Sequence, residues 1–394
     1  MINREDFPFF KNNPEIIYLD SACTSIKPKQ VIDAQKEYYE KLGACAARSS
    51  HKKGRETSLK IEESRETIAK FVNGDADGVV FTKNTTEGLN IVINGLDYSM
   101  KNKVVTTDLE HHAVLLPLMK MRDKGRIKLE IIESENGLIS PEKWKNAIDN
   151  QTRLVVTNSA TNTTGIFQNL ELISKIAHEK ESYLLVDGAQ GVPHSKTDMK
   201  KANIDFLCFS AHKMLGPNGV GALLMKKELV KEVEELSIGG GTVTKVTKQN
   251  YDLVQDQSRF EAGVGDYAGI IGFAKACEYL GKIDYSKRLE HEEKLRAALL
   301  ETLKNNNAQI LGDLNAKRGA LYTFNIKGAK AHDLALMLDQ ENIAVRSGFF
   351  CAQPALSALG SKEGAVRVSA YIYNNIEEIR KFAEKLEKIS AIYS

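Results

Sequence analysis

The chain has 394 residues, of which 42% are hydrophobic and 27% charged, so it can bury a large core and form more than one domain. Its 54 basic and 52 acidic residues give a formal net charge of +2 without a basic block, which argues against nucleic acid or an anionic membrane as the partner. No run reaches the roughly 18 apolar residues of a membrane helix, and the start of the chain lacks a signal peptide's apolar stretch. We therefore expect a cytoplasmic protein that acts on small molecules.

Helical patterns alternate with short apolar runs from about residue 60 onward, starting with a helical spacing over residues 58–72. The apolar runs predict strands at residues 79–81, 103–105, 129–132, 154–156, 183–186 and 206–209. This alternation is typical of an α/β domain in which helices cover both faces of a mostly parallel sheet. Ligands of such sheets bind at the carboxyl ends of the strands.

The pattern changes after Gly263, where long charged helices are predicted at residues 285–303 and 376–392. A short strand is predicted between them, at residues 321–326. We interpret this part as a smaller α+β domain that the N-terminal segment joins. The predicted large domain spans residues 20–265, and the small domain comprises residues 1–19 and 266–394.

Two predicted strands end in residues that can carry chemistry. Asp187 follows the first strand, Gln190 lies three residues later, and the second strand ends in Ser210-Ala211-His212-Lys213. Taken singly, an acid there can be a helix N-cap, and a lysine is more often a surface charge. Together they supply an amine, a carboxylate, and hydroxyl and imidazole donors, which are the groups that a pyridoxal phosphate (PLP) cofactor requires.

These segments resemble the fold-type I PLP enzymes of the class V aminotransferase family, and most closely the SUF-type (SufS-like) cysteine desulfurases and selenocysteine lyases. The resemblance runs from Tyr18 to Asn374. It implies a seven-stranded, mostly parallel sheet in the large domain and a PLP cofactor. It also implies that Lys213 forms a Schiff base with the cofactor, that Asp187 pairs with the ring nitrogen and that Gln190 bonds the phenolic oxygen.

The resemblance assigns further residues to the cofactor. Thr85 and Thr86 belong to a segment similar to the family's phosphate turn, where backbone amides at a helix start receive the anion, and Ser210 and His212 would complete that site. His111 matches the histidine that stacks on the ring and moves protons. The alternatives for the pair His111-His112 are a metal site or a hydrogen-bonded core position. No third ligand follows at metal-like spacing, so we predict no metal, and we interpret His112 as structural.

The segment over residues 344–354 resembles the family's catalytic-cysteine segment, which makes Cys351 the candidate nucleophile. A thiolate suits the step because it is a soft nucleophile, and sulfur taken from another sulfur leaves a persulfide that can be passed on. The alternative is a loop cysteine that the enzyme never uses. Arg346 and Arg367 match residues near the substrate, and a guanidinium binding the α-carboxylate best fits Arg367, although either arginine could form an ordinary ion pair. Asn162 matches an asparagine near the cofactor oxygen and the substrate carboxylate, and its alternative is a turn residue.

The chain has five cysteines, an odd number, widely spaced and without a Cys-x-x-Cys motif, which favours free thiols over a disulfide framework. Apart from Cys351, we expect each to be buried or half-buried as a small apolar residue, namely Cys23, Cys45, Cys208 and Cys277.

Two departures from the family pattern stand out. Phe349 and Phe350 replace two histidines that usually precede the cysteine, which puts sulfur transfer to a zinc-bearing partner in doubt. Val264 replaces a threonine in a segment, residues 259–266, that resembles the one reaching into the neighbouring subunit's phosphate site. One donor hydroxyl is lost there.

The predicted function is that of a PLP-dependent cysteine desulfurase, which converts L-cysteine to L-alanine and transfers the sulfur to Cys351 as a persulfide. Iron-sulfur cluster assembly or other sulfur delivery would use that sulfur. The expected partners are a second copy of the chain, in a homodimer, and a sulfur-acceptor protein. One alternative is a selenocysteine lyase or another class V carbon-sulfur lyase, and a second is a non-catalytic PLP-binding sulfur carrier.

Overall fold

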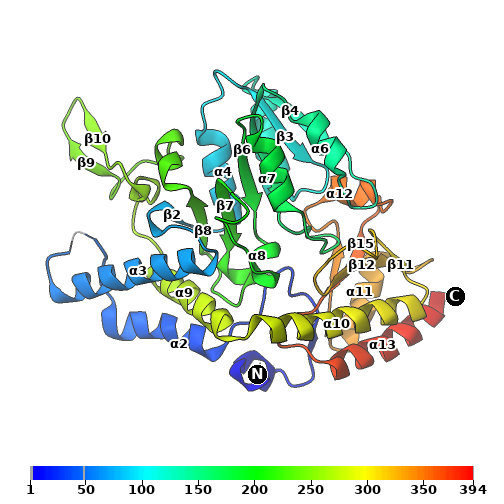
Figure 1. The fold of residues 1–394 in the computed structure, drawn as a ribbon. Helices are drawn as coiled ribbons and strands as arrows, with labels where there is room; N and C mark the ends of the chain where they lie inside the picture. Colours follow the sequence, from blue (N-terminus) through cyan, green and yellow to red (C-terminus); the bar gives the residue numbers. More distant parts are fainter. Residues whose placement is uncertain (1–2, 48, 394) are drawn as a thin grey trace.

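The computed structural model describes residues 3–47 and 49–393. A large domain is built on a seven-stranded sheet and a smaller one on a four-stranded sheet (Figure 1). The N-terminal segment carries the short helix α1 (Pro8–Asn12) and β1 (Ile17–Tyr18), which pairs in parallel with β13 (Ile343–Ala344). This pairing attaches the N-terminal segment to the small domain.

The large sheet has the strand order β2-β8-β7-β6-β5-β3-β4. Only β8 runs antiparallel to its neighbours, so the mostly parallel seven-stranded sheet is confirmed. β8 follows a glycine-rich loop and was not among the predicted strands. The strands are β2 (Val79–Thr82), β3 (Lys103–Thr107), β4 (Lys128–Ile132), β5 (Thr152–Asn158), β6 (Tyr183–Asp187), β7 (Phe206–Ser210) and β8 (Gly221–Met225).

Hydrophobic cores lie on both faces of this sheet, which explains why its strands are continuously apolar. Successive residues point to opposite faces. Thus Val155 belongs to the core on one face and Val156 to the core on the other. The covering helices are α2 (Lys29–Glu37), α3 (Lys52–Phe71), α4 (Thr85–Gly95), α5 (His112–Asp123), α6 (Pro141–Ala147), α7 (Leu170–His178), α8 (Gly191–His194) and α9 (Tyr267–Lys282).

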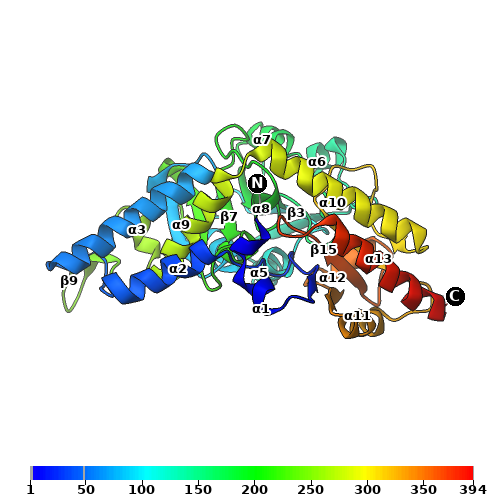
Figure 2. The ribbon, with the colours of Figure 1, turned by 90° about the horizontal axis from the view of Figure 1, so that it is seen from below.

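Helix α9 begins just after the predicted domain boundary at residue 265, but it packs against α2 and α3 (Figure 2). Its apolar residues, among them Ile270 and Phe273, belong to the same core as one face of the large sheet. The packing thus groups α9 with the large domain. The division of the chain into residues 20–265 and the remainder stays a prediction.

The small domain contains an antiparallel sheet in the order β11-β12-β15-β14. Its strands are β11 (Gln309–Ile310), β12 (Leu321–Asn325), β14 (Arg346–Gly348) and β15 (Ala365–Ser369). The predicted long helices are confirmed as α10 (Tyr285–Asn305) and α13 (Ile376–Ser390), which pack side by side, and the shorter ones are α11 (Ala331–Gln340) and α12 (Gln353–Ala358). Ile17 and Leu19 from the N-terminal segment complete the core of this domain.

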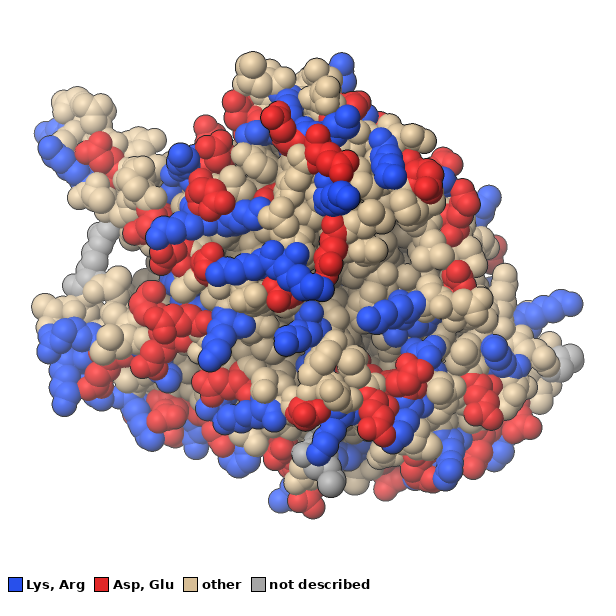
Figure 3. All heavy atoms as spheres, in the orientation of Figure 1, with Lys and Arg blue, Asp and Glu red and all other residues tan. Residues whose placement is uncertain are grey.

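The surface shows no single dominant charge on the face drawn in Figure 3, where acidic and basic side chains are interspersed. A hairpin of β9 (Val243–Val246) and β10 (Tyr251–Leu253) projects from the large domain (Figure 1). Within residues 3–47 and 49–393, no helix has the length and apolar character needed to cross a membrane.

Candidate active site

A cavity of about 260 Å³ lies at the carboxyl ends of the large sheet and is closed by residues of the small domain. The site residues predicted from the sequence all line it: Thr85, Thr86, His111, Asn162, Asp187, Gln190, Ser210, His212, Lys213, Arg346, Cys351 and Arg367. The economical interpretation of a single site built from strand ends therefore agrees with the geometry. Their individual chemical roles stay predictions.

Asp187 and Lys213 both line this cavity, and their charges interact. Asp187 is the last residue of β6, and Lys213 closes a 3-10 helix (Ala211–Lys213) that directly follows β7. Burial raises the pKa of Asp187, and the charge of Lys213 opposes that shift. Burial likewise lowers the pKa of the Lys213 amine, opposed by Asp187. The site therefore offers an amine that burial drives toward its neutral, nucleophilic form beside a carboxylate.

One end of the cavity can hold an anion. The backbone N–H of Thr85, at the start of the eleven-residue helix α4, donates to Ser210 Oγ over 2.8 Å, and the two hydroxyls lie 2.6 Å apart. Thr86 and His212 line the same region, and burial lowers the pKa of His212 to about 4. Helix N-terminal amides with hydroxyl donors around them form a site suited to phosphate.

His111 is held in one tautomer by the helix that follows it. It is the N-cap of α5, and its Nδ1 accepts a hydrogen bond from the backbone N–H of Ala113 at 3.0 Å. Because Nδ1 is an acceptor, the proton of the neutral ring lies on Nε2. Burial, with the charge of Lys213 second, lowers the pKa of His111 to about 4. The ring is therefore uncharged near neutral pH.

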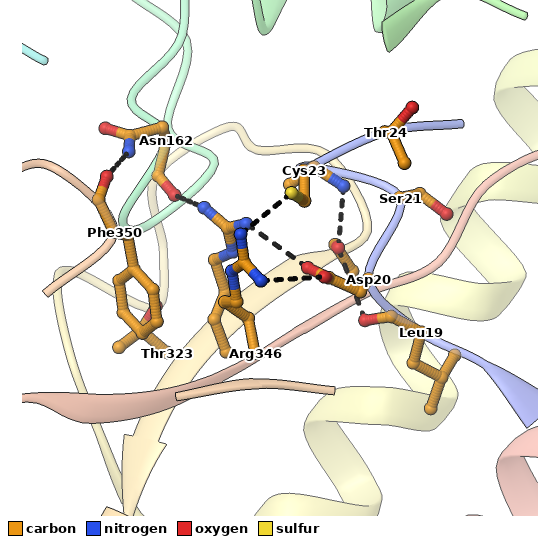
Figure 4. Close-up of polar contacts among 12 residues, drawn as sticks. Leu19, Asp20, Ser21, Cys23, Thr24, Asn162, Thr323, Arg346 and Phe350 are labelled. Atoms are coloured by element: carbon orange, nitrogen blue, oxygen red, sulfur yellow. Dashed lines mark hydrogen bonds and ion pairs between the residues drawn. The ribbon is translucent and has the colours of Figure 1, made fainter. Parts of the chain in front are cut away.

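Two amide side chains of the large domain donate hydrogen bonds to backbone carbonyls of other segments that line the cavity. Gln190 donates through Nε2 to the carbonyl oxygen of Ala22 at 2.7 Å. Asn162 donates through Nδ2 to the carbonyl oxygen of Phe350 at 2.7 Å, which ties it to the loop that carries Cys351 (Figure 4). The contact from Gln190 to a cofactor oxygen, implied by the resemblance, stays a prediction.

The two arginines lie opposite each other on the paired strands β14 and β15. Arg367 is 3% exposed and donates to the carbonyl oxygen of Asn162 at 2.8 Å, whereas Arg346 is exposed. Asp20 contacts both guanidiniums, at 3.4 Å from Arg367 and 3.9 Å from Arg346. Nε of Arg367 has no hydrogen-bond partner among the described residues. A buried guanidinium with spare donors is suited to bind a carboxylate.

Cys351 lies on an exposed loop whose backbone is unusual. Gly348, Phe350 and Cys351 have φ angles of 105°, 52° and 55°, and positive values are costly for the two residues that carry a side chain. The carbonyl oxygen of Cys351 accepts a hydrogen bond from the backbone N–H of His112 at 2.8 Å. Phe350 lines the cavity, with the Arg367 guanidinium 4.9 Å from its ring centroid, and Phe349 is 37% exposed. The thiol is thus reachable from the solvent and from the cavity.

Glu110, to which no role was assigned from the sequence, is fully buried next to the site. Its Oε1 accepts from Thr107 Oγ1 at 2.7 Å and from Asn158 Nδ2 at 3.0 Å. Asn158 pairs with Asp187 across β5 and β6. Burial raises the pKa of Glu110 to about 8. Its position before the histidine pair was visible in the sequence, but its burial was not.

The packing predicted for the remaining cysteines is confirmed for three of them. Cys208 and Cys277 are buried and Cys23 is half-buried. For Cys45 it is wrong, because this thiol lies in the loop before α3, outside the cores, and is exposed. Among the residues described, no group of three or more potential ligands could hold a metal ion.

Comparisons with known proteins agree with this architecture. The family model described as aminotransferase class-V matches residues 17–382. A protein of Pyrococcus abyssi named probable cysteine desulfurase is 37% identical over 391 residues, which cover 98% of this chain and 96% of that protein. One of the same name from Borreliella burgdorferi is 35% identical over 401 residues, covering 98% and 95%.

Solved structures give the same result. The apo structure of a cysteine desulfurase from Thermococcus onnurineus NA1 matches with a TM-score of 0.94 at 36% identity, covering 98% of this chain and 97% of that one. The cysteine desulfurase CsdA from Escherichia coli matches with a TM-score of 0.90 at 26% identity, covering 100% of both chains. The chain therefore belongs to the class V aminotransferase family, and the predicted fold type I is confirmed.

Proposed function

We propose that this protein is a PLP-dependent cysteine desulfurase, which converts L-cysteine to L-alanine and takes up the sulfur as a persulfide on Cys351. The observation that carries the proposal is the composition of one cavity. Lys213 and Asp187 lie on the wall that the large sheet provides, and Arg367 and Cys351 come from the small domain. The names of the full-length relatives support the same activity.

The residues of the cavity fit PLP. Lys213 supplies the amine for the aldehyde, Asp187 a carboxylate for the ring nitrogen, and the start of α4 with Ser210 a site for the phosphate. His111, an uncharged imidazole, suits stacking on the ring. Bound there, PLP supplies an electron-withdrawing ring that weakens the bonds at the α-carbon of an amino acid.

Arg367 binds the α-carboxylate of L-cysteine and exchanges its contact with Asp20 for the substrate. The Lys213 amine, kept toward its neutral form by burial, takes the α-proton. The Cys351 thiolate then attacks the substrate sulfur. A new S–S bond forms, the substrate C–S bond breaks, and its electron pair stays on the β-carbon, which is protonated. The α-carbon then regains its proton from Lys213, which completes alanine. His111 can exchange the proton on Nε2 during this step.

We further propose a cytoplasmic homodimer that hands the sulfur to a protein of iron-sulfur assembly. Val264 is 76% exposed and does not line the cavity of its own chain, which supports a place for this segment at a neighbouring subunit. The exposure of Cys351 gives an acceptor protein direct access to the sulfur. Because Phe349 and Phe350 are not zinc ligands, the acceptor receives no such ligand from them.

The test is the production of alanine and sulfide from L-cysteine by the purified protein supplied with PLP. The Cys351→Ala variant should lose both products and keep the cofactor's absorbance, and Cys45→Ser, at the other exposed thiol, should behave as wild type. Undiminished turnover by Cys351→Ala would refute the role of the thiol. Alanine formed by that variant from L-selenocysteine alone would instead indicate a selenocysteine lyase. Absence of catalytic alanine release by the wild type would indicate a sulfur carrier.

A further inference from the structure

A second thiol, Cys23, lines the same cavity as Cys351. It follows β1 on the N-terminal segment and is half-buried, whereas Cys351 is exposed. Its Sγ accepts a hydrogen bond from Nη2 of Arg346 at 3.0 Å, and Figure 4 shows the sulfur turned toward that guanidinium. Cys208 and Cys277, in contrast, are enclosed in the hydrophobic cores. The cavity therefore holds a pair of thiols, of which the proposed reaction uses one.

Positive charge faces Cys23 from several elements. Besides Arg346 on β14, the sulfur interacts electrostatically with Lys213 after β7 and with Arg367 on β15, and Asp20 is the acid that offsets them. Arg367 is 3% exposed, and its Nε lacks a hydrogen-bond partner within the described parts of the chain. These cationic groups are placed to offset the negative charge that develops on a sulfur atom while sulfur is being transferred.

We propose that Cys23 is a second sulfur acceptor, to which the persulfide of Cys351 passes its terminal sulfur. The inference rests on the proposed function, because that reaction loads Cys351. The Cys23 thiolate attacks the terminal sulfur, a new S–S bond forms on Cys23, and the S–S bond on Cys351 breaks. Cys351 leaves as a thiolate and takes up the proton that Cys23 gave up. One sulfur is transferred without net oxidation, so no further reactant is needed.

The shared cavity gives the persulfide of Cys351 access to Cys23. A persulfide extends its side chain by about 2 Å, the length of one S–S bond. Cys23 and Cys351 both line one cavity of about 260 Å³, and the charge of Lys213 interacts with both residues. After the transfer, Cys351 is free to receive sulfur from a second L-cysteine, so one subunit can hold two transferable sulfur atoms. The sulfur on Cys23 is the more protected, since this residue is less exposed.

The experiment gives the holoenzyme enough L-cysteine for two turnovers of each subunit, alkylates its thiols and persulfides, and locates the added sulfur by peptide mass spectrometry. Persulfide is expected on both Cys351 and Cys23 in the wild type. Cys23→Ala should lower the sulfur bound per subunit from two atoms to one, and Cys351→Ala should leave Cys23 without sulfur. Cys45→Ser is the matched control and should retain both modifications.

The outcomes separate this inference from the proposed function. Persulfide on Cys351 with none on Cys23 would overturn the inference and leave the proposed function intact. Persulfide on Cys23 of the Cys351→Ala variant would overturn the transfer route, whereas an absence of alanine and of both modifications would overturn both proposals. A measurement without turnover adds a second test: mild oxidation should join the Cys23 and Cys351 peptides by a disulfide, and failure to do so would count against direct transfer.

Discussion

The two walls of the cavity differ in how firmly their side chains are held. On the wall formed by the large sheet, Asp187, Gln190 and Ser210 are each at most 5% exposed and stand at or just after the ends of buried strands. On the opposite wall, Arg346 and Cys351 are exposed, and the segment from Gly348 to Cys351 has positive φ angles at three positions. The first wall is fixed by the register of the large sheet. On the second wall, hydrogen bonds from His112 and Asn162 hold the loop that carries Cys351.

This difference matches the two tasks of the proposed reaction. Holding a cofactor requires charges at fixed positions, which strand ends provide because their backbone hydrogen bonds are made within the sheet. Passing sulfur onward requires a thiol that meets the substrate on one side and an acceptor on the other. Residues on loops carry such functions because they can be exposed without loss of core packing.

The largest expected effect comes from replacing Lys213 on the wall formed by the large sheet. The Lys213→Ala variant should lose at least about 10³-fold in kcat, because it removes both the cofactor's covalent anchor and the proposed base. Alanine formation and the absorbance of the bound cofactor are the measurements. Lys227→Ala, which removes an exposed lysine outside the cavity, is the control. A Lys213→Ala protein whose chromophore borohydride still reduces onto the chain would contradict the assignment.

A smaller effect is expected on the small-domain wall at Arg367, which we propose binds the carboxylate of the substrate. Arg367→Lys keeps the charge but loses the planar fork, which should cost about 1.5–3 kcal/mol and thus roughly 10- to 100-fold in kcat/KM for L-cysteine. Most of the change should lie in KM, since the carboxylate is bound before and during the reaction. Arg380→Lys, on the exposed side of α13, should not alter KM. An unchanged KM in Arg367→Lys would remove this residue from the substrate site.

The smallest effect concerns Glu110, the buried acid that accepts a hydrogen bond from Asn158 beside Asp187. Its folded pKa of about 8 lies above the ordinary value of 4.5, so the folded state keeps a proton that the unfolded state releases between these pH values. The resulting stabilisation is complete below pH 4.5 and is lost as the pH rises to about 8. Within that window, this residue lowers the free energy of unfolding by about 1.4 kcal/mol per pH unit.

The variant Glu110→Gln imitates the protonated acid and should lack this slope. Urea unfolding of both proteins at several pH values measures it, and the difference between them isolates Glu110 from other buried acids such as Asp187. Glu301→Gln, on the exposed side of α10, should unfold with the wild-type pH dependence. Parallel curves for wild type and Glu110→Gln would show that Glu110 is ionised in the folded protein.

The sequence by itself determined the α/β architecture and most of the cavity. Alternating apolar runs predict a mostly parallel sheet, and the carboxyl ends of parallel strands meet at one edge, so Asp187 and Lys213 could be placed together from their positions after two strands. The strand signals are local, since each depends on a strand and the few residues that follow it. Cys351 was found differently, through the resemblance of residues 344–354 to the family's catalytic-cysteine segment.

Only the tertiary structure decided which other groups face that cavity. Cys23 and Arg346 are 323 positions apart, and nothing near either residue indicates that they touch. The full burial of Glu110 and the packing of α9 on the large domain likewise depend on elements distant in the chain. The physical reason is that periodicity and turn chemistry act over a few residues, whereas burial and charge pairing depend on how whole domains close on each other.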